Sequence, residues 1–127
     1  MKTYFYFIFL VLFGSCNFAL ADTAPLQITE VMYDFPGTDE NHEYIKIENI
    51  GADPVDITGY KFVDGSSATK HGINLPPKNG SIGSPIIEPS GFLILADNAT
   101  TYIADNPGFA GSVLDSTFSL NNPQWLI

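Results

Sequence analysis

Arginine is absent from this 127-residue sequence, and five lysines stand against 14 acidic residues, which gives a formal net charge of −9. A surface with this charge repels phosphate backbones and anionic lipid headgroups, so the sequence predicts no nucleic-acid binding. Cysteine occurs only at Cys16, so no disulfide can form within the chain. With one cysteine and two histidines, the sequence also offers few of the ligands that a zinc site requires.

Helical periodicity is lacking as well. After the first 21 residues, no segment sustains apolar side chains at i, i+3, i+4 and i+7, so the sequence predicts no helix there. Short runs with apolar residues at every second position recur instead, and Gly, Pro, Asn or Asp separates them about every eight to twelve residues. This pattern is typical of an all-β sandwich or barrel with a single core. The predicted strands are 26–33, 43–50, 55–64, 71–75, 92–96 and 112–120, with a short apolar edge at 86–87.

The first 21 residues have the features of a secretory signal peptide. Lys2 precedes an uninterrupted apolar run at residues 4–13, which is too short to span a bilayer as a mature helix. Ala19 and Ala21 supply the small side chains of a cleavage site, so we expect a signal-peptide helix over 1–21 and a mature domain over 22–127. This domain keeps every acidic residue and loses Lys2, so its formal charge is −10. The protein is thus predicted in the periplasm, on the cell surface or outside the cell.

A second interpretation of the N-terminal segment uses its cysteine. The stretch "LFGSC" resembles a bacterial lipoprotein box, in which Cys16 would carry a lipid and tether the protein to a membrane. Phe13 stands where that box usually has leucine, so cleavage after Ala21 is the preferred prediction. In that case the mature domain contains no cysteine, which is typical of bacterial exported proteins, whereas small eukaryotic secreted domains usually carry disulfides.

The charged stretch 43–65 has two interpretations: a reactive site, or the solvated face of a sheet. Ile45 and Ile47 share one parity and are predicted to be buried, with Lys46 and Glu48 facing solvent. Val55 and Ile57 occupy odd positions, whereas Tyr60 and Phe62 occupy even ones, so the apolar side chains change from one face of the strand to the other. A bulge or bend is therefore expected at Gly59. We interpret the stretch as two strands and their turn. Residues 92–96, "FLILA", predict a central strand buried on both faces, and the polar residues 97–106 predict a loop.

The order of these segments closely resembles the lamin tail domain. The cues are Glu30-Val31 in the first strand, "EYI" running to Asn49 in the second, "VDITGYKFVD" in the third, and "PSG" before "FLIL". The resemblance covers about residues 26–122 and implies an immunoglobulin-like β-sandwich that acts as a non-catalytic structural or protein-interaction module. In bacteria such domains are often appended to larger surface or secreted proteins, including hydrolases, so an accessory domain of a secreted hydrolase is an alternative.

The C-terminus departs from this pattern, because "NNPQWLI" follows Phe118 and Leu120 where the family usually continues with further strands. We therefore expect an incomplete sandwich that lacks C-terminal strands. An unpaired strand edge invites pairing with another chain, so edge-strand self-association is also expected. Trp125 lies past the last predicted strand and is expected to be exposed.

The acidic loop 34–43 is the strongest candidate for a metal site. Asp34, Asp39, Glu40 and Glu43 offer oxygen ligands for calcium, but the spacing of an EF-hand is absent. We predict a solvated loop, with a calcium- or carbohydrate-binding adhesion module as the alternative. A carbohydrate platform would use Tyr44, Tyr60, Phe62 and Phe92, although rings in a small β-sandwich mostly fill the core.

The remaining polar candidates are predicted to be structural. His42 is expected to be an exposed loop residue, and neither it nor His71 has partners for nucleophilic catalysis. Glu30 and Glu43 lie on adjacent strands but are expected to accept hydrogen bonds at strand ends. The serines near glycines lack a nucleophile elbow, and Asn98-Ala99-Thr100 is a chance glycosylation sequon. The sequence thus predicts no enzyme activity, no catalytic residue, no cofactor and no bound metal.

Overall fold

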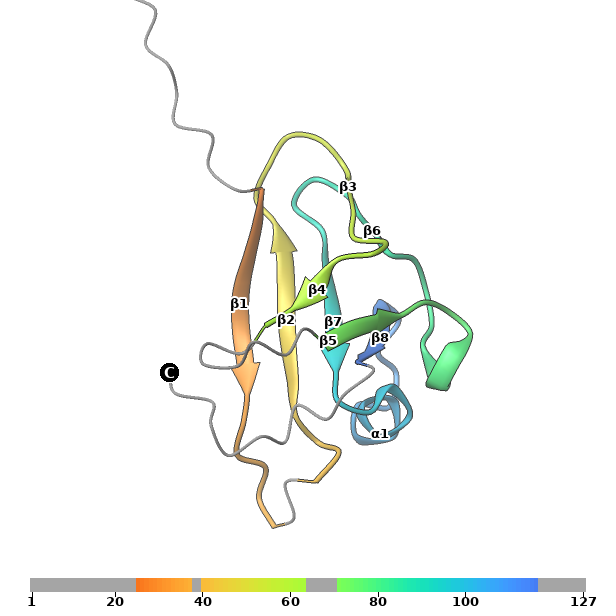
Figure 1. Ribbon diagram of the computed structural model, residues 1–127. Helices are drawn as coiled ribbons and strands as arrows, with labels where there is room; N and C mark the ends of the chain where they lie inside the picture. Colours follow the sequence, from red (N-terminus) through yellow and green to blue (C-terminus); the bar gives the residue numbers. More distant parts are fainter. Residues whose placement is uncertain (1–24, 38–39, 64–70, 117–127) are drawn as a thin grey trace, which may run out of the picture.

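The computed structural model describes residues 25–37, 40–63 and 71–116, and they form a β structure with one short helix (Figure 1). The all-β prediction is therefore confirmed. The elements are β1 (Leu26–Met32), β2 (Tyr44–Asn49), β3 (Val55–Asp56), β4 (Lys61–Phe62), β5 (His71–Asn74), the 3₁₀ turn η1 (Lys78–Gly80), β6 (Ile86–Ile87), β7 (Phe92–Ala96), α1 (Ala99–Asp105) and β8 (Ser112–Ser116).

A six-stranded sheet forms the body of the domain, with the strand order β1-β2-β7-β8-β5-β4. All neighbouring pairs are antiparallel except β7 and β8, which are parallel. β7 lies between β2 and β8, and Leu93 to Ala96 are all buried, as predicted for "FLILA". Its apolar side chains fill both faces because protein covers each face of this strand.

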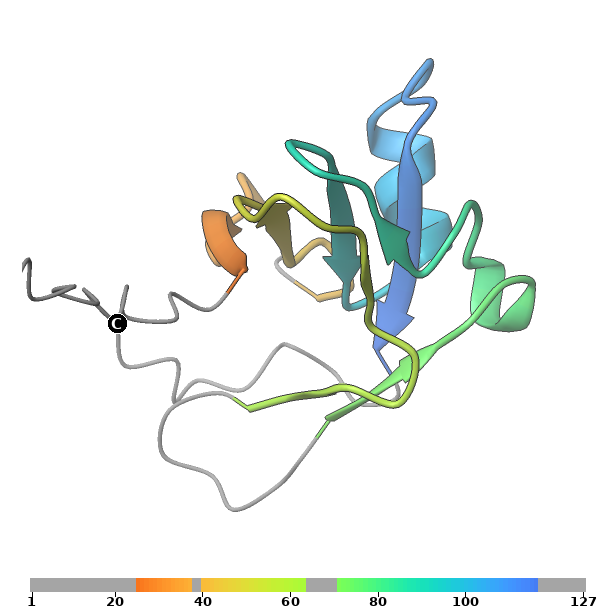
Figure 2. The same ribbon diagram turned by 90° about the horizontal axis from the view of Figure 1, so that it is seen from above.

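The sheet is strongly curled. β1, β2, β7 and β8 form a row, and β4 and β5 turn away from it and cross in front of its inner face (Figures 1 and 2). A separate two-stranded sheet, β3 with β6, lies beside the same interior. The side chains enclosed there form the main core, consisting of Ile45, Ile57, Ile87, Leu93, Leu95 and Leu114. Ile47, Val55 and Phe62 pack against it, so the predicted inward side of stretch 43–65 is confirmed.

Helix α1 covers the opposite face of the row and corrects the prediction of a loop over 97–106. Asn98 caps it, because its side chain accepts a hydrogen bond from the Thr101 amide at 3.0 Å. Ala99 and Tyr102 are buried in a second core with Ile94, Ala96 and Val113. Seven residues give only two turns, too few for a sustained helical repeat in the sequence, and for this reason the periodicity missed it.

At Gly59, where a bulge or bend was predicted, the chain turns from one sheet to the other. Gly59 has a φ of +80°, which favours glycine, and it separates β3 in the small sheet from β4 in the large one. The predicted strand 55–64 is therefore two short strands. The irregularity of register lies elsewhere, in β1 between Ile28 and Glu30.

Several predictions fall on residues that are not described: the signal peptide over 1–21, the lipidation of Cys16, the strand residues 117–120 and the exposure of Trp125. In the three ranges that are described, no helix is long and apolar enough to cross a membrane.

Candidate functional site

An apolar groove opens between the two ends of the large sheet. Its lining side chains come from β1, β2, β4, β5, β7 and the turn before β4; they are Leu26, Ile28, Ile45, Ile47, Ile57, Tyr60, Lys61, Phe62, Ile73 and Leu95. We call this set the edge groove. Its floor is the main core, since Ile45 and Leu95 are completely buried, whereas Ile28 and Tyr60 on its rim are 49% and 51% exposed.

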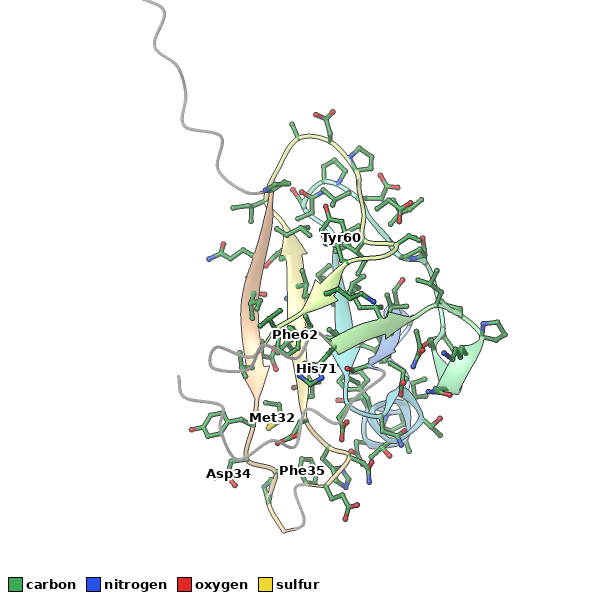
Figure 3. All side chains as sticks on the ribbon, in the orientation of Figure 1. Met32, Asp34, Phe35, Tyr60, Phe62 and His71 are labelled. Carbon is green, nitrogen blue, oxygen red and sulfur yellow. The ribbon has the colours of Figure 1, made fainter. Side chains whose placement is uncertain are left out.

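The strand order explains why the edge groove exists. β1 and β4 are the two ends of the sheet, and each has a single hydrogen-bonded neighbouring strand among the residues that the structure describes. The curl brings both ends around one cavity, because Leu26 and Ile28 of β1 line it together with Lys61 and Phe62 of β4. Figure 3 shows Tyr60 and Phe62 on the segment that crosses in front of the row. Among the described residues, the edge groove is thus a gap between the two ends of the large sheet.

The edge groove has the volume and the apolar lining expected of a site for apolar side chains, and it is too small for a typical small-molecule ligand. Its volume is about 80 Å³, roughly half that of the ~150 Å³ engineered cavity that binds benzene and well below the ~300–1,000 Å³ of small-molecule sites. Apart from the Lys61 ammonium and the Tyr60 hydroxyl, its lining side chains are aliphatic or a phenyl ring. A groove of this volume has room for one or two apolar side chains, and no reactive groups converge among its described lining residues.

The four aromatic residues considered for a carbohydrate platform do not share a surface. Tyr60 and Phe62 line the edge groove, whereas Tyr44 packs against the second core on the other face. Phe92 is on that other face as well, where the Lys46 ammonium lies 4.2 Å from the centre of its ring. The expectation that these rings fill the core is wrong for Tyr60 and Phe92, which are 51% and 42% exposed.

Glu30 and Glu43 have separate environments. The Tyr44 hydroxyl donates a 2.6 Å hydrogen bond to Glu30 Oε1, so the expected structural role of Glu30 is confirmed. Burial, and then this bond, raise the pKa of Tyr44 well above its ordinary value. Glu43 is only 8% exposed, and its carbonyl accepts from the Asp97 amide at 2.9 Å. The prediction that the whole acidic loop is solvated is therefore wrong at Glu43, which directly precedes β2 and is buried beside Asp97.

His42 attaches the acidic loop to helix α1. Its Nδ1 lies 2.6 Å from Asp105 Oδ2, and its ring stacks on Phe35 with centroids 4.3 Å apart. The side chain is 24% exposed, so the prediction of an exposed loop histidine is corrected by these two contacts. His71 is buried, with its ring centroid 6.0 Å from that of Phe62.

Over the described ranges, no three His, Cys, Asp or Glu side chains are grouped to hold a metal ion. Asp39, one of the four residues considered as calcium ligands, lies outside those ranges. Of the serines near glycine, Ser81 is structural: its hydroxyl donates to the Asn74 carbonyl and accepts from the Asp115 amide, both at 2.9 Å. The sequon residue Asn98 serves as the helix cap.

No sequence pattern indicated the edge groove directly. Its residues belong to six segments between Leu26 and Leu95, and nothing in the pattern of any one segment shows that it meets the others. One available signal was the expectation of unpaired edges. The exposure of the apolar side chains Ile28 and Tyr60, which marks where those edges lie, is visible only in the structure.

The Lamin Tail Domain family profile matches residues 20–125, which includes every strand and the helix. No curated protein and no solved structure matches the chain. The family match agrees with the curled, immunoglobulin-like arrangement of the sheets. The chain therefore belongs to the lamin tail domain family.

Proposed function

We propose that this chain is a non-catalytic, exported module that binds a protein partner by accepting an extended segment of that partner in the edge groove. The observation that carries the proposal is the position of the groove. An apolar floor lies between β1 and β4, two strands that each have one neighbour among the described residues. Extended peptides bind such edges through main-chain hydrogen bonds, and pockets beside the edge select alternate side chains.

Side chains, more than backbone pairing, determine the binding. The irregular register between Ile28 and Glu30 interrupts β1, so an added strand finds only short regular stretches on either side of it. Leu26, Ile28 and Tyr60 then contact the apolar side chains of the partner. The favoured partner segment has apolar residues at every second position, and an acidic residue beside Lys61 would add a charge pair at the rim.

A peptide selection tests this function. A library of extended dodecamers is selected on the purified chain, and bound peptides are measured with Ile28→Asp and Ile86→Asp variants. Ile86 is the matched control because it is 45% exposed but lies on β6, outside the groove. Peptides that lose affinity with Ile28→Asp and keep it with Ile86→Asp support the proposal. Peptides that bind both variants equally contradict it.

Export is the second part of the proposal and is supported by Lys2, the apolar run 4–13 and the small residues before Asp22. Fusion of residues 1–30 to a reporter that is active only outside the cytoplasm tests it, with Lys2 and three residues of the run changed to Asp as the control. Mass spectrometry of the exported chain separates cleavage before Asp22 from lipidation of Cys16. A reporter that stays inside the cell contradicts export.

Calcium or carbohydrate binding remains the alternative function. The exposed Phe92 ring with Lys46 at 4.2 Å is the feature that favours a sugar, and the acidic loop is the feature that favours calcium. Calorimetry with Ca²⁺ and a glycan panel distinguishes these ligands. Heat with Ca²⁺ that disappears in Asp39→Ala would establish the loop site and displace the protein-interaction proposal as the primary function.

A further inference from the structure

We infer that the edge groove recognises the C-terminal end of its partner, with the free α-carboxylate of that chain end beside Lys61. The inference deepens the proposed function and rests on it, because it names the part of the partner that enters the groove. Two features point to a chain end: the charge of Lys61 and the short strands on either side of the groove.

Lys61 brings a positive charge to an apolar surface. Among the described residues that line the edge groove, it is the single charged one, and it is exposed. No described carboxylate forms an ion pair with its ammonium, because the ion pair found across the described ranges joins His42 to Asp105. The groove therefore complements a ligand in which a carboxylate is attached to apolar residues.

The strands beside the groove are short. β4 consists of Lys61 and Phe62, and the irregular register of β1 leaves only the stretches 26–28 and 30–32 in regular pairing. The volume of about 80 Å³ has room for one or two apolar side chains, which in an extended segment lie two positions apart. The last three residues of a chain are thus enough to fill the site, whereas an internal segment would extend beyond β4 in both directions.

An α-carboxylate fits this position better than the other charged groups of a peptide. It is attached directly to the backbone, so placing it beside Lys61 costs no side-chain rotamer entropy, unlike the placement of an Asp or Glu side chain. An N-terminal ammonium would be repelled by Lys61. The favoured ligand is therefore a chain end with apolar residues at the last and third-last positions and a free carboxylate, a recurrent mode of peptide recognition.

Matched peptides test this preference. A library displayed with free C-termini is selected on the purified full chain, and each bound peptide is synthesised as the free acid, as the C-terminal amide and with two glycines appended. The free acid should bind about three- to fivefold more tightly than the other two forms, as expected for an exposed ion pair. The net charge of −9 repels carboxylates at long range, so a preference for the acid requires a local contact.

A pair of lysine variants locates that contact. Lys61→Met removes the charge and keeps a long apolar side chain, so it should abolish the difference between acid and amide. Lys78→Met is the matched control, because Lys78 is exposed in η1 and is not among the lining residues. This control should keep the difference. Circular dichroism of both variants verifies that the sheet is intact.

Two results would overturn the inference while leaving the proposed function standing. Equal affinity of the three peptide forms shows that the groove takes an internal segment. A preference for the acid that Lys61→Met leaves unchanged shows that the carboxylate lies elsewhere. In both cases the peptides still lose affinity with Ile28→Asp. Peptides that bind Ile28→Asp as well as the unchanged chain, or a selection that yields no bound peptide, overturn the proposed function and the inference together.

Discussion

Asn74 Nδ2 donates a 2.7 Å hydrogen bond to Asp115 Oδ1, and both residues are almost fully buried. The same carboxylate accepts from Asn79 Nδ2 at 3.1 Å and from the Ala99 amide at 3.3 Å. One side chain on β8 therefore connects β5, the turn η1 and the start of α1. A buried carboxylate is tolerated here because each of its oxygens has a donor.

Replacing Asp115 should weaken the packing of β5, η1 and the start of α1 against β8. We expect Asp115→Ala to lower the free energy of unfolding by about 2–4 kcal/mol, since two buried donors and the partly buried Asn79 amide lose their acceptor. Urea denaturation followed by circular dichroism measures the loss. Asp56→Ala is the control, because Asp56 is exposed and accepts from the amide and the hydroxyl of Thr58 in a surface turn. Equal losses in the two variants would contradict a special role for Asp115.

Asn49, the last residue of β2, connects this strand to the loop that follows it and to β6. Its Nδ2 donates to the carbonyls of Asp53 and Ile87, both at 2.8 Å, and its Oδ1 accepts from the Gly51 amide at 2.9 Å. Asn49→Asp keeps the shape but removes both donors, so we expect a loss of about 3 kcal/mol.

The matched control for this substitution is Asn98→Asp. Asn98 accepts a bond at the start of α1, and a carboxylate accepts equally well there, so stability should change by less than about 1 kcal/mol. Both variants are compared by thermal and urea unfolding at pH 7. A similar loss at both positions would show that the new charge, and not the missing donors, is responsible.

Gly83 lies where the loop after η1 passes close to β8. Its φ is +83°, and a Cβ there would lie 2.7 Å from the Ser112 Cα and clash with Ser112 Oγ. Gly83→Ala should therefore cost about 2–4 kcal/mol, from backbone strain and overpacking together. Gly59→Ala has a similar φ of +80° but no neighbour within 4 Å, so only the strain of about 1 kcal/mol is expected. Calorimetric unfolding of both variants separates the two contributions.

The Tyr44–Glu30 bond should make stability depend on alkaline pH. Burial and this bond raise the pKa of Tyr44 above its ordinary value of 10.0, and burial raises that of Tyr102 as well. In the unfolded chain these phenols lose their protons first, so their contribution is fully present below pH 10 and falls as the pH rises above it. Tyr44→Phe should make the free energy of unfolding less sensitive to pH between about 9.5 and 11.

Urea unfolding at several alkaline pH values measures this dependence, and phenolate absorbance of the folded chain gives an independent readout. The expected titration of Tyr44 lies above the ordinary tyrosine pKa of 10.0. A variant with the same pH dependence as the unchanged chain would contradict the assignment to Tyr44.

The alternation of apolar and polar residues predicted the strands, because the face on which a strand residue lies depends only on its position relative to its neighbours in the sequence. Ile45 and Ile47 face the core as their parity required, and Leu93 to Ala96 form a central strand as their unbroken apolar character indicated. The same method missed α1, since Ala99, Tyr102 and Ile103 make only one apolar turn. It also placed His42 in solvent, because neither Phe35 nor Asp105 is recognisable as its partner in the sequence.

By itself, the sequence determined that extended strands would bury alternate apolar side chains and that the chain would carry a formal net charge of −9, since both depend on residue type and short-range order. The tertiary structure decided the curl that brings β1 and β4 around one apolar groove. It also decided the pairing of Asn74 with Asp115, which are 41 positions apart. These relationships depend on which distant segments meet, and only the packing of the whole chain fixes that.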